Sequence, residues 1–371
     1  MRIAVDALGI HYYGGGRTAT LNLFEALLSM DENNEYLFFL TQPEPSLTSP
    51  RGNASQRIAP VSNRFLVRIW AQFVIPLAAK NCDLIHFSKH LGVFGISSPS
   101  VVTIYDMTTL VHPEIYPFID VWYWRSLQKR TLNNAKKIIA ISNNTAKDLR
   151  QIYDLPDDKI RVIFPAIADQ FRPLPAENVS NVLDAYNIPD RYIIHVGRID
   201  KKKNLTLLVQ AFSRYLDRNL SELNLVLVGE DYAKSPDTEL RPTIRDLGLE
   251  KQVIFTGKVP DHDLPALYNG ALATVFPSIH EGFGLAPIEA MACGCPVIGH
   301  SAGAFKEVAN DAALILDSIG IETLAEGLSQ IIEDDSLRHR LRQFGFERAA
   351  NFKPEKTATQ TMQLYEEIGL N

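Results

Sequence analysis

The amino-acid sequence predicts an α/β protein made of two doubly wound parallel sheets, each in its own domain. The chain has 371 residues, which is more than one hydrophobic core usually holds. Short apolar runs alternate with helical patterns along both halves, as βαβ units require. A polar, proline-rich segment at residues 171–190 separates the halves, and we expect it to be the linker. The first domain is then residues 1–170.

The composition indicates a globular enzyme without a general affinity for nucleic acid. Hydrophobic residues make up 46% and charged residues 22% of the chain, which is ordinary for a folded soluble protein. Up to Ala168 there are 17 Lys and Arg against 14 Asp and Glu, and beyond it 20 against 29, so the halves carry +3 and −9. The acidic half argues against a nucleic-acid partner. The mildly basic first half leaves room for an anionic partner or membrane surface.

The cysteines and the apolar runs indicate the cellular compartment of the protein. Cys82, Cys293 and Cys295 are an odd set, and Cys293 and Cys295 lack the further ligands that a zinc site needs, so we expect buried thiols. No apolar run reaches the ~18 residues of a membrane span. We therefore expect a cytoplasmic protein.

The first half opens like a βαβ unit. An apolar strand at residues 3–8 precedes Gly14, Gly15 and Gly16, and a helix follows with Leu21 and Phe24 on its apolar face. The glycines lack the G-x-G-x-x-G spacing, so a dinucleotide site is not supported. Five further strands are expected in this half at residues 36–40, 83–87, 101–105, 137–141 and 161–164.

Polar groups follow two of these strands, where ligands of such sheets gather. One set is residues 86–90, and the other includes Tyr105 and Asp106. Asp106 after an apolar run is costly to bury unless it is paired or used. Capping of the next turn and a functional role are equally compatible with its position.

Two predicted helices combine bulky apolar and basic residues. They cover residues 64–73 and 121–130 and contain few acids. Helices of this kind can lie on an anionic bilayer, which would make the protein a peripheral membrane protein on the inner face of the plasma membrane. A place in the domain core with a solvated basic edge is the more common alternative.

The second half repeats the alternation and adds a cationic loop. The strand at residues 192–196 ends in a loop with Arg198 and three lysines, the last of them Lys203. Cations at a strand end suit an anionic ligand such as a diphosphate. Further strands are expected at residues 224–228, 253–255, 271–276 and 297–299.

A glycine-punctuated stretch from Pro277 to Pro296 organises this half. It contains a loop with Gly282 and Gly284 and a short helix expected from Leu285 to Gly294. A helix start offers unpaired N–H groups and a partial positive charge, which receive phosphate. Two carboxylates, Glu281 and Glu289, bracket the helix start and can accept hydrogen bonds from paired hydroxyls. Either glutamate alone would pass for an ordinary structural residue.

A metal is not expected. Asp261 and Asp263 form a D-x-D pattern, but a helix follows directly, so Asp261 is better explained as its N-cap. Two cations and a helix N-terminus can supply the charge that a metal would.

With these residues the chain resembles the retaining, nucleotide-sugar-dependent glycosyltransferases of family 4, which have the GT-B fold. The match runs from Gly14–Gly16 through Arg198 and Lys203 to residues 281–285 and Glu289. The resemblance implies two Rossmann-like domains facing each other across a cleft. It also implies that residues 191–353 bind the nucleotide sugar and that residues 354–371 cross back to the first domain.

The resemblance also assigns roles. Arg198 and Lys203 would bind the donor diphosphate, Glu289 the ribose and Glu281 the transferred sugar. The residues expected to bind the donor are Gly15, Gly16, Arg198, Lys203, Val259, Glu281, Gly282, Phe283, Gly284, Leu285 and Glu289. The residues expected on the acceptor side are Arg17, Tyr105 and Asp106, and those expected to be catalytic are Asp106, Arg198, Lys203 and Glu281.

One position departs from the family pattern. Many relatives have His-Asp where this chain has Tyr105 and Asp106. Tyr105 is neutral at pH 7, which leaves Asp106 as the candidate for orienting the acceptor. The expected activity is transfer of a hexose, with mannose as the candidate sugar, from a nucleotide diphosphate sugar to a glycan or lipid-linked acceptor in surface polysaccharide synthesis. A sugar-phosphate isomerase or phosphorylase and an inactive carbohydrate-binding protein are the alternatives.

Overall fold

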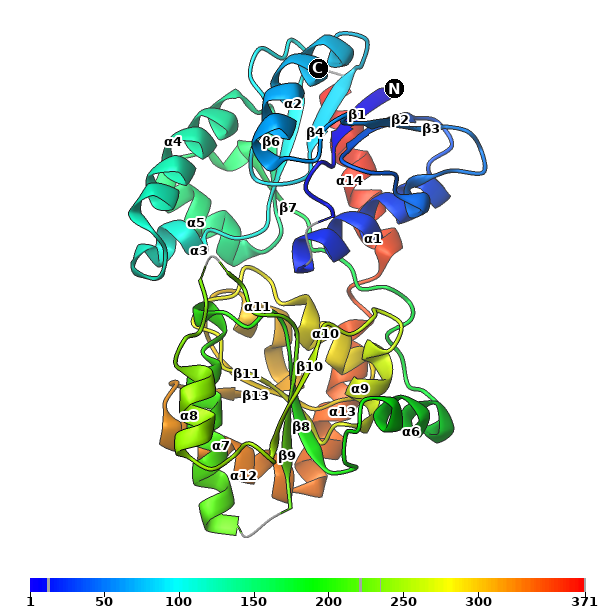
Figure 1. Ribbon diagram of the computed structural model, residues 1–371. Coiled ribbons are helices and arrows are strands. Elements are labelled where there is room, and N and C mark those ends of the chain that lie inside the picture. Colours follow the sequence, from blue (N-terminus) through cyan, green and yellow to red (C-terminus); the bar gives the residue numbers. More distant parts are fainter. Residues whose placement is uncertain (12–13, 220–221, 234, 370–371) are drawn as a thin grey trace. The chain divides into compact units, whose positions relative to one another are not determined.

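The computed structural model describes residues 1–11, 14–219, 222–233 and 235–369. The chain forms two compact units, which we call unit 1 and unit 2. Unit 1 contains Met1–Ile167 and Phe352–Asn371, and unit 2 contains Ala168–Asn351. Each unit is a parallel sheet covered by helices on both faces (Figure 1). Residues 370–371 of the predicted last segment lie outside the described part of the chain.

Unit 1 holds a seven-stranded parallel sheet in the order β3-β2-β1-β4-β5-β6-β7. The strands are β1 (Arg2–Asp6), β2 (Glu35–Leu40), β3 (Ala54–Ile58), β4 (Leu84–Phe87), β5 (Ser100–Ile104), β6 (Lys137–Ala140) and β7 (Ile160–Val162). The central strands are mostly apolar because both of their faces are covered. Strand β3 was not predicted from the sequence, because this edge strand is short, polar and largely exposed.

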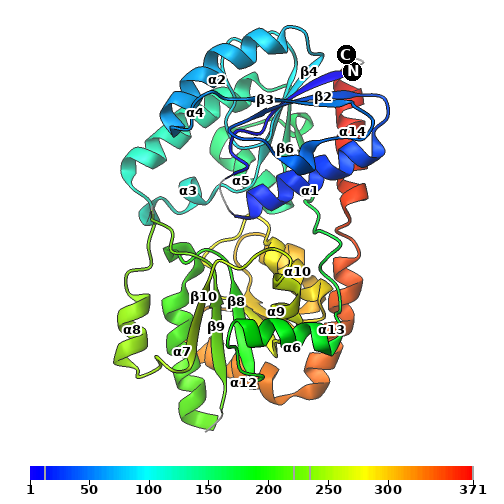
Figure 2. The same cartoon turned by 45° about the vertical axis from the view of Figure 1, so that its right-hand side comes forward.

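Helices cover the two faces of this sheet (Figures 1 and 2). On one face α1 (Gly15–Met30) and α14 (Pro354–Gly369) share a core with β1, β2 and β4. On the other face α2 (Arg64–Ala79), α4 (Phe118–Asn134) and α5 (Asn143–Tyr153) share a second core. A single turn, α3 (Thr108–Val111), follows β5.

The last helix is part of unit 1 although it comes from the end of the chain. Tyr365 of α14 is fully buried and its hydroxyl lies 2.6 Å from His86 Nδ1 on β4. The other nitrogen of this imidazole lies 2.7 Å from the Thr103 hydroxyl. Burial lowers the pKa of His86 to about 3, so the ring is neutral and structural. Among residues 86–90, His86 therefore tethers α14 and does not face a ligand.

Unit 2 holds a six-stranded parallel sheet in the order β10-β9-β8-β11-β12-β13. The strands are β8 (Tyr192–Val196), β9 (Asn224–Val228), β10 (Val253–Gly257), β11 (Ala273–Phe276), β12 (Val297–His300) and β13 (Ala313–Leu316). Strand β13, a four-residue edge strand that follows a helical turn directly, was not predicted from the sequence.

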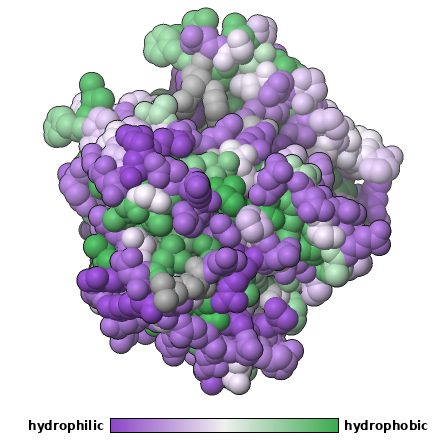
Figure 3. All heavy atoms as spheres, turned by 60° about the horizontal axis from the view of Figure 1, so that its bottom comes forward, coloured by the Kyte–Doolittle hydropathy of each residue, from purple (hydrophilic) through white to green (hydrophobic). Residues whose placement is uncertain are grey.

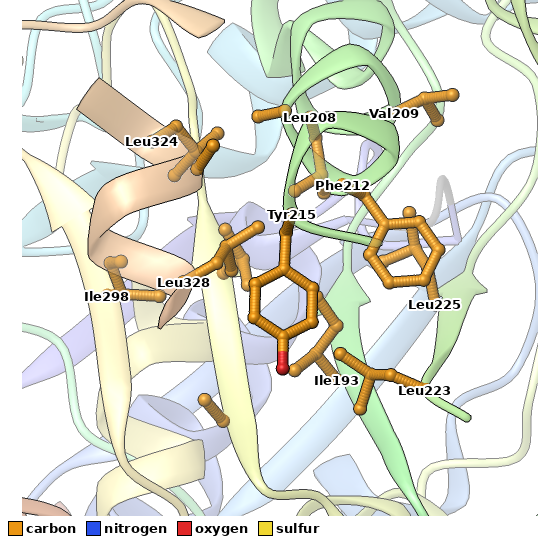
Figure 4. Close-up of a cluster of buried hydrophobic side chains, with 14 of the residues drawn as sticks. Ile193, Leu208, Val209, Phe212, Tyr215, Leu223, Leu225, Ile298, Leu324 and Leu328 are labelled. Carbon is orange, nitrogen blue, oxygen red and sulfur yellow. The ribbon is translucent and has the colours of Figure 1, made fainter. Parts of the chain in front are cut away.

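The helices of unit 2 also lie on both faces of the sheet. The helices α7 (Leu205–Asn219), α8 (Leu240–Asp246) and α12 (Ile321–Glu333) share one core, where Phe212 and Tyr215 pack against strand residues and Leu328 (Figure 4). On the other face are α6 (Ala176–Ala185), α9 (Leu264–Gly270), α10 (Leu285–Ala292) and α11 (Phe305–Ala309), while α13 (Asp335–Ala349) packs against α10.

Helix α6 lies within the segment predicted as a linker. It begins directly after Pro175 and packs against α9, with Leu183 buried. Proline is well tolerated before the first helical turn, so the prolines of this segment mark a helix start as well as a loop.

Hydrophilic residues cover most of the molecular face shown in Figure 3, and hydrophobic side chains appear there in small groups. Scattered exposed apolar residues are normal for a folded protein.

Candidate active site

The strand order of unit 2 defines where a ligand is expected. From β8 the chain moves to β9 and β10 on one side, and then returns to β11 on the other side of β8. Neighbouring strands whose connections leave in opposite directions form a topological switch point, and ligands of doubly wound sheets bind beyond the carboxyl ends of those strands. The loop with Arg198 and Lys203 follows β8, and the loop with Glu281 follows β11. The fold therefore brings these predicted residues to one edge.

Two hydrogen bonds to backbone carbonyls hold the two loops together. Ile279 donates its N–H to the Lys202 carbonyl at 2.8 Å, and the Asn204 side chain donates to the Pro277 carbonyl at 3.3 Å. A third loop, after β12, lies against Glu281. Gly303 has φ +57° there, and a Cβ atom on it would come within 2.2 Å of the Glu281 carbonyl oxygen. A side chain at position 303 would therefore displace Glu281.

Lys203 and Glu281 form the closest charged contact at this edge. Lys203 Nζ donates to Glu281 Oε1 at 2.6 Å, and both side chains are largely buried. Burial of Glu281 opposes its ionisation, but the charges of Lys203 and Lys202 outweigh it and lower its pKa to about 2. Glu281 is thus ionised at neutral pH. Because an ammonium group has three donors, Lys203 can hold Glu281 and a phosphate oxygen together.

Arg198 presents its guanidinium near the same edge with more exposure to solvent. Its side chain is 44% exposed, its Cζ lies 4.1 Å from the ring centroid of Tyr232, and Nη2 lies 3.9 Å from Asp200 Oδ2. Stacking on an aromatic ring orients the planar group without using its N–H donors. Those donors can therefore reach an anionic ligand.

Glu289 lies on α10, which begins after Gly284. Gly284 has φ +90°, the left-handed region that favours glycine, and α10 starts at Leu285 as the sequence predicts. Glu289 is buried, and the Tyr268 hydroxyl donates to its Oε2 at 3.4 Å. Burial and the charge of Asp261 raise the pKa of Glu289 to about 7. The two glutamates thus differ in charge state, since Glu281 has a cation beside it and Glu289 does not.

His195 is a buried residue at this edge that sequence reasoning missed. It lies on β8, and its Nδ1 is 2.8 Å from the Val275 carbonyl oxygen, which makes Nδ1 the donor and Nε2 the acceptor. Nε2 is buried without a hydrogen-bond partner and lies 3.2 Å from the position that a Gly197 Cβ would take. The only sequence signal was a histidine directly before the cationic loop.

The remaining predicted donor residues also follow strands of this sheet. Gly282, Phe283 and Leu285 continue the loop after β11, and Phe283 is buried. Val259 is buried in the loop after β10, which is the edge strand two positions away from β8.

The prediction that Asp261 caps the next helix is wrong. Helix α9 begins at Leu264, its N-cap is Asp263, and no side chain caps it. The Asp263 carboxylate instead accepts a hydrogen bond from the Tyr186 hydroxyl at 2.9 Å, which ties α6 to the start of α9.

Unit 1 has a switch point of its own, between β1 and β4. Gly14 precedes α1 with φ +131°, and Gly15 and Gly16 form its first turn. After β4, Lys89 extends toward this turn and its Nζ donates to the Gly9 carbonyl at 2.6 Å. A Cβ atom on Gly16 would lie 3.6 Å from Lys89 Cε. Sequence reasoning did not single out Lys89.

Tyr105 contacts the first turns of α1. Its hydroxyl lies 2.8 Å from the Thr20 hydroxyl, and its ring packs edge to face with His90. Burial raises the pKa of Tyr105 to about 12. Tyr105 is therefore a neutral hydrogen-bonding group at every physiological pH.

Asp106 and Arg17 both have intramolecular partners. Asp106 Oδ1 accepts a hydrogen bond from the Thr108 N–H at 3.1 Å, so Asp106 caps the turn after β5. Asp148 on α5 is close enough that Asp106 contributes, after burial, to raising the Asp148 pKa to about 6. Arg17 forms an ion pair with Glu44 at 3.6 Å. Asp148 was not predicted, because it lies on α5 and the sequence does not show that α5 packs close to Asp106.

Comparison with known proteins decides the family. Residues 13–171 match the model of Glycosyltransferase Family 4, and residues 184–348 match the model of Glycosyl transferases group 1. The O-antigen chain mannosyltransferase B of Escherichia coli is 30% identical over 267 residues, which are 72% of this chain and 70% of that protein. The chain belongs to the family 4 glycosyltransferases.

Further relatives and solved structures agree with this. The serotype-specific mannosyltransferase WbdA of Escherichia coli is 28% identical over 73% of this chain, which spans only 35% of WbdA. The sucrose-phosphate synthase of Thermosynechococcus elongatus (TM-score 0.80, 22% identity) covers 99% of both chains. The Anabaena protein HepE in complex with UDP and glucose (TM-score 0.81, 19% identity) covers 99% of this chain and 100% of its own. These structures establish the GT-B fold.

The predictions of the family, the GT-B fold and a hexosyltransferase enzyme are thereby confirmed. The comparisons do not favour an isomerase, a phosphorylase or an inactive binding protein. None of the helices in the described part of the chain has the length and hydropathy needed to span a bilayer. The roles of individual site residues and a reaction without a metal stay predictions.

Proposed function

We propose that this glycosyltransferase moves mannose from a nucleotide diphosphate sugar to a glycan or lipid-linked acceptor in surface polysaccharide synthesis, with retention of configuration. The proposal of mannose draws on those relatives that are named O-antigen chain or serotype-specific mannosyltransferases. The single observation that carries the assignment of a donor site is the buried Lys203–Glu281 pair at the switch point of unit 2, with Arg198 and the start of α10 on the same edge.

Each of these groups suits one part of the donor. Arg198 and Lys203 would bind the diphosphate, together with the backbone N–H groups from Gly282 to Leu285. Glu281, ionised beside Lys203, would accept hydrogen bonds from the transferred sugar. Glu289 would bind the ribose hydroxyls, and Val259 would lie near the base. In unit 1, Gly15 and Gly16 would contribute to the donor, and Arg17, Tyr105 and Asp106 to the acceptor.

The chemical step breaks the bond between the sugar C1 and the diphosphate oxygen, and the electron pair stays on the diphosphate. The acceptor oxygen bonds to C1 on the same face, and its proton passes to the leaving phosphate. Negative charge grows on the diphosphate as the bond breaks, so Arg198 and Lys203 would stabilise the transition state more than the ground state. Asp106 would orient the acceptor hydroxyl.

The cytoplasm, at the inner face of the plasma membrane, is the proposed location. Cys82, Cys293 and Cys295 are buried free thiols, which fits a reducing compartment. No metal or other cofactor is part of the proposal.

A transfer assay with purified protein tests the proposed function. GDP-mannose, UDP-glucose and UDP-galactose are offered with a lipid-linked mannosyl acceptor, in excess EDTA. Mannosyl product from GDP-mannose is the expected result. Product only from another donor would overturn the assignment of the sugar, and activity only after manganese is added would overturn the metal-free reaction.

A further inference from the structure

Exposed hydrophobic side chains concentrate on two helices of unit 1. Among the described residues, fourteen large hydrophobic side chains are exposed, and nine of them lie on α2 and α4. Both helices pack on the same face of the unit 1 sheet and contribute to one core. Scattered exposure would be ordinary, but a concentration on neighbouring helices marks an interaction surface.

Helix α2 carries an apolar stripe on its outward side. Its buried residues include Val67, Ala71 and Ile75, which face the core. On the opposite side Phe65, Ile69, Phe73 and Leu77 follow one another at four-residue spacing, and Phe65 and Phe73 are each 73% exposed. The core of unit 1 covers only one of the two apolar sides of α2, so the outward side is available for contact with a partner.

Helix α4 adds aromatic and basic residues to this surface. Phe118, Ile119, Trp122 and Tyr123 are exposed at its start, and Phe118 is 84% exposed. Arg125, Lys129 and Arg130 are exposed in the turns that follow. Aromatic residues with a polar edge beside basic side chains are typical of the boundary between lipid headgroups and acyl chains.

Phe94 joins the two helices into one surface. The Gln72 side chain of α2 donates to the Phe94 carbonyl at 2.9 Å, and the Arg130 guanidinium of α4 lies 4.5 Å from the Phe94 ring centroid. The loop that carries Phe94 therefore lies between α2 and α4. We call the exposed residues named above, together with Leu66 and Arg68 of α2 and its C-cap residue Lys80, the α2/α4 surface.

The charges of this surface decide which partner fits. Arg68, Lys80, Arg125, Lys129 and Arg130 are exposed basic residues, α2 has no acidic residue, and Asp120 is the acidic residue of α4. In a symmetric contact between two copies the same patch faces itself, so like charges would oppose one another. An anionic bilayer instead attracts the basic groups and accepts the aromatic and aliphatic ones.

We propose that the α2/α4 surface docks this enzyme onto an anionic lipid bilayer, with Phe65, Phe73, Phe118 and Trp122 inserted at the headgroup level and the basic residues against the lipid phosphates. This inference names the membrane partner of the proposed function. Docking would keep unit 1 at the surface where a lipid-linked acceptor is presented.

Co-sedimentation of the full-length protein with vesicles tests the proposal without an activity assay. Vesicles of phosphatidylcholine alone are compared with vesicles that also contain phosphatidylglycerol. The wild type is expected to bind the anionic vesicles and to remain in the supernatant with the neutral ones. The double variants Phe73→Gln/Trp122→Gln and Arg125→Gln/Lys129→Gln should each lower the partition coefficient about tenfold or more.

Matched controls use exposed positions of the same chemical kind on unit 2. Leu247→Gln/Phe344→Gln is the hydrophobic control and Lys251→Gln/Arg340→Gln the basic control, and both should bind like the wild type. All altered side chains are exposed, and unchanged melting temperatures check that the variants fold. If Phe73→Gln/Trp122→Gln melts early, Phe65→Gln/Leu77→Gln replaces it.

Two results would overturn the docking proposal. One is a failure of the wild-type protein to bind anionic vesicles, or binding of the α2/α4 variants to these vesicles with the affinity of the wild type. The other is a wild-type dimer in sedimentation velocity that Phe73→Gln/Trp122→Gln dissociates, because the surface would then be a contact between copies. Vesicle binding without any sugar transfer would refute only the proposed function, and transfer without vesicle binding would refute only the docking.

Discussion

Lys203 Nζ lies 2.6 Å from Glu281 Oε1, and this contact joins the loops that follow β8 and β11. Both charges are largely buried, and the charge of Lys203 keeps Glu281 ionised. Removing one partner leaves the other as an uncompensated buried charge. Removing one charge should therefore lower both the stability and the transfer activity, whereas removing both charges should lower mainly the activity.

The first prediction separates these responses. Lys203→Met should destabilise unit 2 by about 3 kcal/mol, because the Glu281 carboxylate is left unpaired in a buried site. The double variant Lys203→Met/Glu281→Gln should recover most of that stability and should transfer no measurable sugar. Chemical denaturation of the single and double variants measures the first effect, and a transfer assay the second. Recovery of transfer in the double variant would show that the pair is structural only.

A second prediction concerns acid stability. The folded-state pKa of Glu281 is about 2, below the ordinary value of a glutamate, so the ion pair stabilises the fold above the unfolded pKa. This stability should be lost as the pH falls from about 4.5 toward 2. In Lys203→Met/Glu281→Gln this part of the pH dependence should be missing. Chemical denaturation of both proteins between about pH 2 and pH 5 measures this. If the midpoint depends on pH in the same way in the wild type and in the double variant, Lys203 does not lower the pKa of Glu281.

The third prediction concerns Glu289, for which stability should change with pH in the opposite direction. Its pKa is raised to about 7, mainly by burial, so the free protein loses stability as the pH rises from about 4.5 to 7. Ionised Glu289 is the form that accepts hydrogen bonds from ribose hydroxyls, so donor affinity should rise as the pH passes through about 7. Titration calorimetry across this range should show that rise in the wild type. Glu289→Gln should flatten it, and the exposed control Glu250→Gln should not.

The fourth prediction concerns the acceptor side. Asp106→Asn keeps an oxygen that can accept from the Thr108 N–H, so unit 1 should fold normally. Transfer should fall by roughly one to two decades in rate if Asp106 orients the acceptor in the transition state. Donor affinity should stay near that of the wild type. Equal losses in transfer and donor affinity would indicate that Asp106 acts in donor binding or folding. The control is Asp158→Asn, on the exposed turn before β7.

Tyr105 gives a fifth prediction. Burial raises its pKa to about 12, so it cannot act as a base at physiological pH, and Tyr105→Phe should leave the shape of the pH–rate profile unchanged. The loss of the contact with the Thr20 hydroxyl should lower stability by about 1 kcal/mol. A missing limb in the pH–rate profile of the variant would contradict this account.

Much of the fold follows from local patterns in the sequence. Central strands such as β8 and β9 have the predicted bounds because their residues are apolar on both faces. The edge strands β3 and β13 were missed, because β3 is polar and largely exposed, and β13 has four residues and directly follows a helical turn. Helix α6 was missed because the prolines before it also suit a linker.

The candidate site was only partly predictable. Arg198, Lys203 and Glu281 stand at strand ends, where sequence alone favours ligand binding, and the structure places them on one edge. The different charge states of Glu281 and Glu289 depend on their surroundings in the fold, namely the cation Lys203 beside Glu281, and burial together with the charge of Asp261 at Glu289. Such three-dimensional neighbours leave no spacing pattern in the sequence.

Binding of a nucleoside diphosphate tests the central claim most directly. Titration calorimetry with GDP and with UDP, in excess EDTA, compares the wild type with Lys203→Ala and with the exposed-lysine control Lys251→Ala. We predict that at least one of the two nucleotides binds the wild type and the control equally, and that Lys203→Ala weakens its binding by roughly one to two decades, as the loss of a charge-assisted contact requires. Equal affinity of Lys203→Ala and the wild type would contradict the assignment of the donor site.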